Sequence, residues 1–292
     1  MAKSEESFLV STAWLAERLG GPDLRVVDGS WHLPETGRDP YAEYEAGHIP
    51  GARFFDIDRI ADRASALPHM LPPVEQFVSA VRKLGIGDGH RVVVYDQAGL
   101  FSAARVWWMF RVFGHSDVAV LDGGLPKWVA EGRPVEDEFP DIRERHYTAR
   151  RDASLVRDVT QVAGAAKLGT EQIVDARSPG RFAGFEPEPR PGLRGGHIPG
   201  AVNLHYRTLL NADGTMKDPD AIRSLVEAAG IDLNRPLVTT CGSGVTACIL
   251  NLALNRIGHG RNAVYDGSWA EWGAYPDLAV ATSADAPGKA GG

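Results

Sequence analysis

A short glycine-containing loop holds the residues with the clearest chemical potential, Cys241-Gly242-Ser243-Gly244-Val245-Thr246-Ala247. The apolar residues 237–240 before it predict a buried strand, and the apolar run 247–257 after it predicts a helix that ends at Gly258. Cys241 therefore lies where a strand ends and a helix begins, facing unpaired backbone N–H groups and the positive end of a helix dipole. This environment favours the thiolate, which is the nucleophilic form of cysteine.

Two alternative interpretations of this loop are a buried cysteine without chemical function and a phosphate-binding loop. A cysteine at a strand end can be a small buried side chain without chemical function, but glycines on both sides of Ser243 let the backbone fold closely around a ligand. Cysteine-dependent phosphatases use a related loop in which an arginine six positions after the cysteine clamps phosphate. That position is Ala247 in this sequence, which argues against phosphate chemistry.

The composition narrows the function classes. A chain of 292 residues can hold two ordinary domains, and 43% hydrophobic with 24% charged residues is typical of a globular protein. The net charge of −7 argues against nucleic acid or an anionic membrane surface as a partner. No apolar run reaches the roughly 18 residues of a membrane span, and no CxxC or HExxH motif predicts a metal site. The polar N-terminus and the two cysteines, Cys241 and Cys248, predict a cytoplasmic protein with reduced thiols.

Strands and helices alternate along the chain, which predicts an α/β fold with a largely parallel sheet. In the first half, apolar runs predict strands at 9–11, 25–28, 53–56, 91–96 and 118–122. The segments between them predict helices at 12–20, 42–47, 73–84, 102–113 and 126–131.

An internal repeat divides the chain into two halves. The segment Gly47-His48-Ile49-Pro50-Gly51-Ala52 recurs letter for letter at 196–201, a shift of 149 residues. Three further segments recur in the same order with shifts of 147, 145 and 144 residues, namely 26–28 at 173–175, 92–96 at 237–241, and 120–124 at 264–268. Four ordered matches at nearly one spacing predict a duplicated α/β domain, because so long a period does not fit a solenoid.

The repeat predicts the domain boundaries and assigns the chemistry to one half. We expect a first domain at 8–135, a charged and proline-containing linker at 136–160, a second domain at 161–282 and a flexible tail at 283–292. Asp96 occupies the position of Cys241 in the first half, so only the second half has the nucleophile. Ligand sites of open α/β sheets lie outside the carboxyl ends of the strands, where Cys241 is predicted.

The tandem domain, the His-Ile-Pro-Gly-Ala segment in both halves and the cysteine loop after a buried strand resemble the rhodanese superfamily of sulfurtransferases. The resemblance covers almost the whole chain and implies an α/β fold of two tandem rhodanese-like domains, each a mostly parallel sheet flanked by helices. The loop that begins at Cys241 is similar to that of the branch that uses 3-mercaptopyruvate. The thiosulfate branch typically carries basic residues directly after the cysteine, and this loop is neutral.

The resemblance implies a two-step sulfur transfer without a metal or an organic cofactor. Cys241 would take sulfur from 3-mercaptopyruvate as a persulfide, release pyruvate, and pass the sulfur to cyanide or to a thiol such as that of reduced thioredoxin. Backbone N–H groups of the loop, including those of Gly242, Gly244, Val245 and Thr246, would stabilise the negatively charged sulfur. Two alternatives are a thiosulfate sulfurtransferase and a persulfide carrier module.

Two arginines in the segment 180–190 are expected to bind the substrate. In the superfamily, arginines at the positions of Arg181 and Arg190 hold the carboxylate and carbonyl of the substrate, and a guanidinium matches a carboxylate bidentately. The alternative is that both are exposed loop arginines.

Side chains of the first half are expected to reach the same site. By resemblance, Asp58 and His69 lie near Ser243 and form a relay that assists proton movement. Asp56 is an alternative acid for this relay, since it lies two residues from Asp58.

The repeated histidines His48 and His197 are expected to be structural rather than catalytic. Their segment also occurs in the half that lacks the nucleophile, and its proline and glycine fix a turn into a strand.

Overall fold

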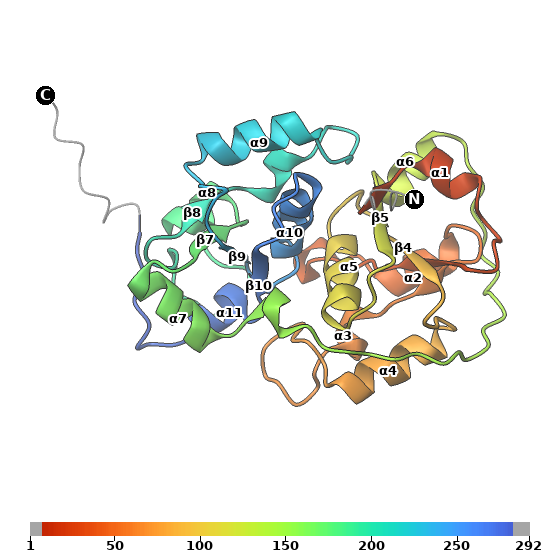
Figure 1. Ribbon diagram of the computed structural model, residues 1–292, viewed down its shortest axis with the longest axis horizontal. Coiled ribbons are helices and arrows are strands. Elements are labelled where there is room, and N and C mark those ends of the chain that lie inside the picture. The colour runs from red at the N-terminus through yellow and green to blue at the C-terminus, as the bar shows by residue number, and fades with distance from the viewer. Residues whose placement is uncertain (1–7, 283–292) are drawn as a thin grey trace, which may run out of the picture.

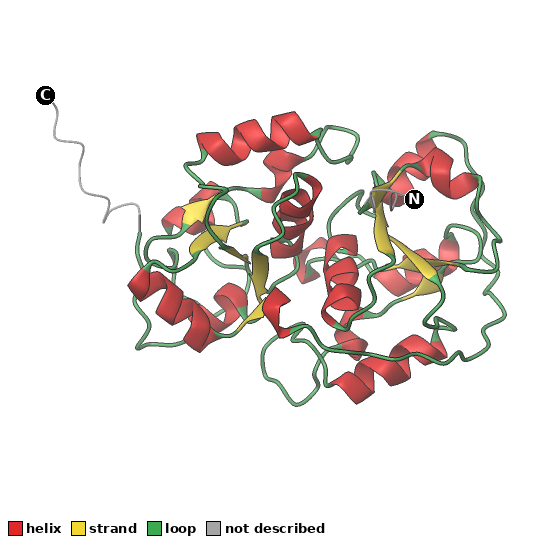
Figure 2. Cartoon of the chain, in the orientation of Figure 1, coloured by secondary structure: helices red, strands yellow, loops and turns green. Residues whose placement is uncertain are grey.

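The computed structural model describes residues 8–282 of the chain. Two α/β units lie side by side, with the first half of the chain in one unit and the second half in the other (Figure 1, Figure 2). Each unit has a five-stranded sheet in which neighbouring strands are parallel. The tail predicted at 283–292 lies outside the described residues.

The first sheet has the strand order β1-β5-β4-β2-β3. Its strands are β1 (Leu9–Val10), β2 (Leu24–Asp28), β3 (Arg53–Phe54), β4 (Arg91–Tyr95) and β5 (Val118–Leu121). These are the five predicted strands, with ends that differ by up to two residues. Valine-rich β4 and β5 are buried, as expected where helices cover both faces of a parallel sheet.

The helices of the first unit are mostly those that the sequence predicts. They are α1 (Thr12–Ala16), the 3₁₀ turn η1 (Pro34–Thr36), α2 (Pro40–Ala46), α3 (Ile57–Ile60), α4 (Val74–Lys83), α5 (Ala103–Val112) and α6 (Gly124–Ala130). Helix α1 is shorter than predicted, and the short α3 was not predicted. Helix α4 is amphipathic and buries Phe77 and Val81, whereas α5 is buried on nearly all sides.

The second sheet repeats the same topology in the order β6-β10-β9-β7-β8. Its strands are β6 (Val156–Arg157), β7 (Gln172–Asp175), β8 (Val202–Asn203), β9 (Leu237–Thr240) and β10 (Asn262–Tyr265). Its helices are η2 (Ala153–Leu155), α7 (Val159–Leu168), α8 (Pro179–Ala183), η3 (Tyr206–Leu209), α9 (Pro219–Ala228), α10 (Ala247–Arg256) and α11 (Ser268–Trp272). The two units therefore have one architecture, as the internal repeat predicts.

Part of the segment predicted as a linker, 136–160, belongs to the second unit. Strand β6 pairs with β10, and α7 begins at Val159 with a capping box between Asp158 and Gln161. The stretch that contains β6 is assigned from the sequence to the charged linker, so this strand is not predicted. At the other end, Glu136 pairs with His48 of the first unit.

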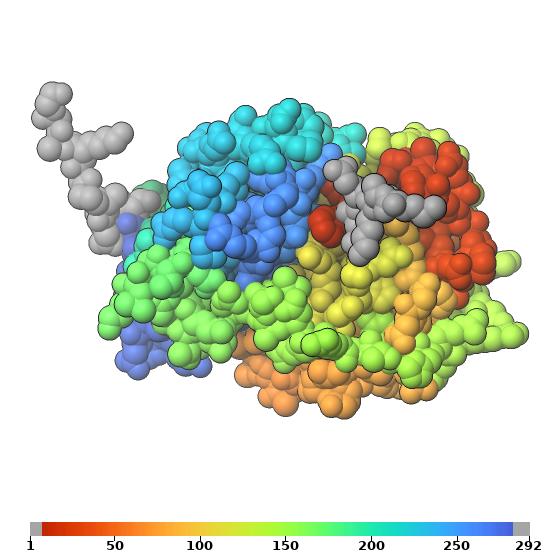
Figure 3. Space-filling view, in the orientation of Figure 1, coloured from red at the N-terminus to blue at the C-terminus, as the bar shows by residue number. Residues whose placement is uncertain are grey.

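Helices α5 and α10 pack against each other and join the two units (Figure 1). One hydrophobic core continues across this contact, from Phe110 on α5 to Ile249 on α10. In the space-filling view the two halves meet directly (Figure 3). Trp31 after β2 and Phe101 after β4 line one cavity with Cys241 after β9, so groups from both units reach one site. No helix among residues 8–282 is long and apolar enough to cross a membrane.

Candidate active site

Cys241 lies directly after β9, and α10 begins at Ala247. Only 2% of the cysteine is exposed, and it lines a cavity of about 270 Å³ between the two units. Other residues that line the cavity include Trp31, Leu33 and Phe101 from the first unit and Arg181, Arg190, Tyr206 and Arg207 from the second. The predicted loop residues Gly242, Ser243, Val245 and Thr246 also line it.

The backbone N–H groups of the Cys241 loop have no internal acceptors. None of the N–H groups of residues 242–247 donates a hydrogen bond to any group within residues 8–282. Buried or half-buried N–H groups normally have a partner. A ring of such donors at the start of a helix is a ready site for an anion.

The corresponding loop of the first unit already holds an anion. Four backbone N–H groups donate to the Asp96 carboxylate, those of Ala98 at 2.9 Å, Phe101 at 2.7 Å, Ser102 at 2.9 Å and Ala103 at 2.9 Å. The same fold element therefore binds negative charge through its backbone. In the second unit Cys241 stands in place of the aspartate, and its side chain is shorter. The backbone N–H groups of that loop can therefore donate to a thiolate or to its substrate.

Two glycines allow close contacts around the loop. A side chain at Gly242 would come within 2.9 Å of Nη2 of Arg181. Gly244 has a φ of +77°, and a Cβ there would lie 2.8 Å from the Asp266 carbonyl oxygen and 3.0 Å from Nη1 of Arg105. Gly242 thus lets a guanidinium approach the loop, and Gly244 lets the loop turn against its neighbours.

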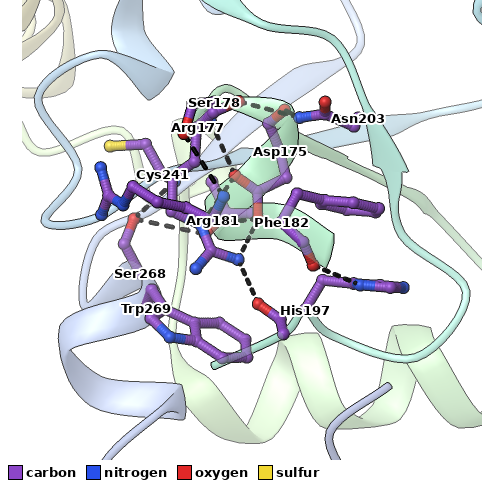
Figure 4. Close-up of polar contacts among 12 residues, drawn as sticks. Asp175, Arg177, Ser178, Arg181, Phe182, His197, Asn203, Cys241, Ser268 and Trp269 are labelled. Atoms are coloured by element: carbon purple, nitrogen blue, oxygen red, sulfur yellow. Dashed lines mark hydrogen bonds and ion pairs between the residues drawn. The ribbon is translucent and has the colours of Figure 1, made fainter. Parts of the chain in front are cut away.

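Arg181 is held beside the loop by a buried carboxylate. The Glu188 carboxylate accepts hydrogen bonds from Nη2 of Arg181 at 2.5 Å and from Nη1 of Arg177 at 2.7 Å. Arg177 in turn pairs with Asp175 at the end of β7 and lies over the Trp269 ring at 4.2 Å (Figure 4). Arg181 is therefore a structured, partly buried group rather than a free loop arginine.

Arg190 lines the cavity and has no carboxylate partner among residues 8–282. No ion pair joins it to an acidic group of residues 8–282, and its side-chain hydrogen bond is to Nε2 of His69 at 3.3 Å. Burial lowers the pKa of Arg190, and the electrostatic interaction with Cys241 opposes this shift. A guanidinium that is half-buried beside the nucleophile and free of carboxylates is suited to bind an anionic substrate.

The structure brings Asp58 and His69 together but does not place them against Ser243. Nδ1 of His69 lies 2.8 Å from Oδ1 of Asp58, and the Asp58 carboxylate also accepts from Nε1 of Trp31 at 3.0 Å. Burial lowers the pKa of His69 despite the neighbouring carboxylate, so the ring is neutral near pH 7. Nε2 of the neutral ring faces Arg190 rather than Ser243.

The alternative acid Asp56 has a local role. Its side chain accepts the backbone N–H of Arg59 at 3.0 Å and caps α3. It also pairs with the Arg59 side chain at 3.3 Å. These contacts explain Asp56 without reference to the cavity.

Comparisons with known proteins decide the family. A family model described as the Rhodanese-like domain matches residues 11–131 and again residues 158–275. The chain belongs to the rhodanese-like family. The superfamily resemblance and the two-domain duplication predicted from the sequence are therefore confirmed.

Several relatives resemble this rhodanese-like protein over most of their length. Human 3-mercaptopyruvate sulfurtransferase is 44% identical over 270 residues, which cover 90% of this chain and 91% of the human protein. The Escherichia coli K12 protein of the same name is 41% identical, covering 94% and 98%. Bovine thiosulfate sulfurtransferase is 46% identical, covering 90% and 91%. The crystal structure of SseA, a 3-mercaptopyruvate enzyme of E. coli, matches with a TM-score of 0.83 and 38% identity over 91% of this chain and 100% of that one.

A buried ion pair between the two rhodanese-like units supports the site, and the sequence did not reveal it. Arg105 on α5 is fully buried and contacts Asp266 after β10 at 2.7 Å. The same guanidinium donates to the carbonyl oxygens of Gly244, at 3.4 Å, and His69. Asp266 also accepts the backbone N–H of Leu71 at 2.8 Å. Arg105 thus ties the cysteine loop to the first-unit segment that carries His69.

The second cysteine is not a further nucleophile. Cys248 donates from Sγ to the Gly244 carbonyl at 3.2 Å, and burial raises the pKa of its thiol well above the ordinary value. Both cysteines are free thiols. Within the described residues, no cluster of three or more His, Cys, Asp or Glu side chains could hold a metal ion.

The repeated histidines of the rhodanese-like units bond to their own backbone. Nδ1 of His48 lies 2.8 Å from the Tyr44 carbonyl oxygen, and Nδ1 of His197 lies 2.8 Å from that of Phe182. Each ring also stacks on the aromatic side chain of the same partner (Figure 4 shows the second pair). These contacts support the structural interpretation.

Proposed function

We propose that this protein transfers sulfur from 3-mercaptopyruvate, through a persulfide on Cys241, to a thiol or cyanide acceptor and releases pyruvate. The observation that carries the proposal is the set of loop N–H groups around Cys241 that have no acceptor among residues 8–282, beside Arg190, which has no carboxylate partner in that part of the chain. The human and E. coli relatives named for this activity support it.

In the first step, one bond forms and one breaks. The Cys241 thiolate attacks the sulfur of 3-mercaptopyruvate, and an S–S bond forms as the C–S bond breaks. The electron pair of the C–S bond moves into the carbon fragment, which is the enolate of pyruvate and takes up one proton. The loop N–H groups stabilise the sulfur anion before and after transfer, and the loss of one such donor elsewhere costs about 3 kcal/mol.

Arg190 is proposed to bind the carboxylate of the substrate, and Arg181 to stabilise charge on the enolate oxygen. Both guanidiniums line the cavity, and Glu188 keeps Arg181 in place. Ser243 is proposed to donate or relay the proton, because this residue lines the same cavity. Asp58 contacts His69, and His69 contacts Arg190. This chain of contacts favours a role for Asp58 and His69 in orienting Arg190 over direct proton transfer to Ser243.

In the second step, the acceptor attacks the outer sulfur of the persulfide. Cyanide leaves as thiocyanate, and a thiol leaves as a persulfide that a second thiol, as in thioredoxin, reduces to sulfide while a disulfide forms. Cys241 returns as the thiolate. A cytoplasmic location with reduced thiols belongs to the proposal and is supported by the two free cysteines.

The first unit is proposed to support the site rather than to carry out chemistry. Its own loop holds the Asp96 carboxylate where the nucleophile would be. It contributes Trp31, Leu33 and Phe101 to the cavity wall.

Mass spectrometry tests the proposal directly. Incubation with 3-mercaptopyruvate should add one sulfur atom to Cys241, and added cyanide should remove it. Cys241→Ser should abolish the gain in mass, and the matched variant Cys248→Ser should keep it. A wild-type protein that gains no sulfur would sink the proposal, and turnover with small molecules alone would exclude a carrier without activity of its own.

A thiosulfate sulfurtransferase is the second candidate, favoured by the 46% identity to the bovine enzyme. Residues 242–247 carry no Lys or Arg. The loop itself therefore places no cation next to thiosulfate, which is a compact dianion, or next to the sulfite that leaves. Equal molar concentrations of the two donors should load Cys241 faster from 3-mercaptopyruvate. Faster loading from thiosulfate would make the second candidate the main activity.

A further inference from the structure

Two residues other than glycine have a positive φ among the described residues, and both lie at the active site. They are His69, with a φ of 61°, and Ser268, with a φ of 50°. The left-handed region is unfavourable for residues with a side chain, and such residues concentrate at functional sites. His69 contacts Arg190, and Ser268 contacts Cys241.

In the repeat, glycines take the places of both residues. The backbone N–H of Trp269 donates to the Cys241 carbonyl at 3.0 Å, as that of Leu125 does to the Asp96 carbonyl at 3.0 Å, so Ser268 corresponds to Gly124. The backbone N–H of Leu71 donates to Asp266, as that of Met216 does to Asp122, so His69 corresponds to Gly214. The glycines have φ values of 56° and 80°. The backbone shape is therefore common to both units, and the two positions that carry a side chain on it are those next to the active site, Ser268 in the second unit and His69 in the first.

The loop itself explains how a side chain fits at position 268. A Cβ at Gly124 would lie 2.5 Å from the carbonyl oxygens of both Asp96 and Gly99. The first-unit loop runs from Asp96 to Ser102, whereas the second-unit loop, from Cys241 to Thr246, is one residue shorter. We attribute the space for the Ser268 side chain to this shortening.

The Ser268 hydroxyl is fully buried and makes three hydrogen bonds. It accepts the backbone N–H of Cys241 at 3.2 Å and the Thr240 hydroxyl at 3.3 Å, and it donates to the Tyr265 carbonyl at 2.8 Å (the contact with Cys241 is drawn in Figure 4). In the first unit, the backbone N–H of Asp96 has no acceptor among residues 8–282. The contact to the nucleophile's own backbone is thus an addition specific to the second unit.

We propose that Ser268 is a positioning residue that fixes the Cys241 backbone so that its sulfur faces the loop N–H groups and Arg190. This inference rests on the proposed function. By accepting the Cys241 N–H, Ser268 removes the freedom of the residue to rotate out of the donor ring, and small displacements of a reacting atom slow a reaction strongly. A purely structural role does not account for a side chain in a backbone conformation that glycine adopts more easily.

The variants Ser268→Gly and Ser268→Ala test this proposal. Both should lower the rate constant for sulfur loading from 3-mercaptopyruvate, and that for Cys241 alkylation by iodoacetamide, by about tenfold or more. Ser268→Gly should keep or raise the thermal midpoint of unfolding, because glycine relieves the positive φ, whereas Ser268→Ala should lower it. A variant that is as stable as the wild type but slower separates positioning from folding.

Thr240→Val is the matched control, since it removes a hydroxyl from the same cluster but not the one that accepts the Cys241 N–H. Its rate constants should stay within about twofold of the wild type. Wild-type rates in Ser268→Gly, or losses that merely follow the unfolded fraction, would overturn the inference. If the wild type takes no sulfur from 3-mercaptopyruvate, the proposed function fails, and alkylation of Cys241 still decides the role of Ser268.

Discussion

At the residue scale, the two arginines of the site, Arg181 and Arg190, differ in whether a carboxylate is paired with them. Arg181 is paired with the buried Glu188, whereas Arg190 contacts the neutral His69 ring and has no carboxylate partner among residues 8–282. The substrate's carboxylate should therefore gain most from Arg190. This difference between two arginines nine positions apart is not apparent from the sequence, because both lie in one polar loop.

Arg190→Lys should lower kcat/KM for 3-mercaptopyruvate by roughly 10- to 100-fold, the loss expected when a charged, bidentate hydrogen-bonded contact is replaced by a point charge. The effect with thiosulfate should be smaller, because that donor has no carboxylate. Steady-state kinetics with both donors measure the difference. Arg207→Lys, at an exposed arginine that lines the same cavity, is the control and should change kcat/KM less than about threefold. Equal losses for both donors would contradict the assigned role of Arg190.

Two replacements of His69 distinguish the effect of its backbone conformation from the effect of its ring. His69→Gly and His69→Ala should both reduce loading from 3-mercaptopyruvate, because Arg190 loses its neighbour. His69→Gly should be about 1 kcal/mol more stable than His69→Ala, because only glycine takes a φ of 61° without steric strain. Urea denaturation of the two variants measures this difference. If the alanine variant were the more stable, the strain assigned to His69 would be wrong.

At the element scale, the loop between β9 and α10 is shaped by what packs behind it. Gly244 and Gly200 have the same φ of +77°, but a Cβ would be crowded by Asp266 and Arg105 at the first position and would meet nothing within 4 Å at the second. The two glycines therefore allow backbone strain to be separated from packing within one unit.

Gly200→Ala should lower the free energy of unfolding by about 1–2 kcal/mol, the cost of a left-handed residue with a side chain. Gly244→Ala should lower it by about 2–5 kcal/mol, since overpacking adds to the same backbone term. It should also slow alkylation of Cys241, because the loop must shift away from Arg105. Chemical denaturation and iodoacetamide kinetics check both. Equal destabilisation by the two substitutions would show that the loop around Gly244 accommodates the added Cβ without overpacking.

The sequence predicts elements and the nucleophile better than it predicts contacts. Valine-rich runs and glycine stops indicate the strands and α5, and the repeat locates Cys241 opposite Asp96. The short β6 and the Arg105–Asp266 pair are not predicted. Strand β6 lies next to the charged stretch that is assigned from the sequence to a linker, and the ion pair joins residues 161 positions apart. The resemblance suggests that Asp58 and His69 approach each other, but their orientation toward Arg190 follows from packing against Trp31.

At the scale of the whole molecule, Arg105 and Asp266 connect the two units beside the active site. A buried charge that loses its partner destabilises a protein by about 3–5 kcal/mol. Arg105→Met should therefore lower the free energy of unfolding by about this amount, and Arg105→Met with Asp266→Asn should recover much of the loss. Denaturant titration of single and double variants gives the coupling between the two sites.

The pair Arg256–Asp122 provides the control for that experiment. These groups are 3.9 Å apart and partly exposed, so Arg256→Met should change stability by less than about 1 kcal/mol. A similar loss for Arg256→Met, or no recovery in the double variant, would mean that the buried pair contributes no specific coupling between the units.

The Asp96 loop has a consequence for competition among small anions. A carboxylate attached to the chain is present at its own binding site at an effective concentration that free sulfite, thiosulfate or phosphate in solution does not match. The first unit therefore acts as a receptor that is permanently occupied by its own tethered ligand. Anionic metabolites should bind to one of the two corresponding loops, the one at Cys241, and this pair of loops should therefore bind them with a stoichiometry of one per chain.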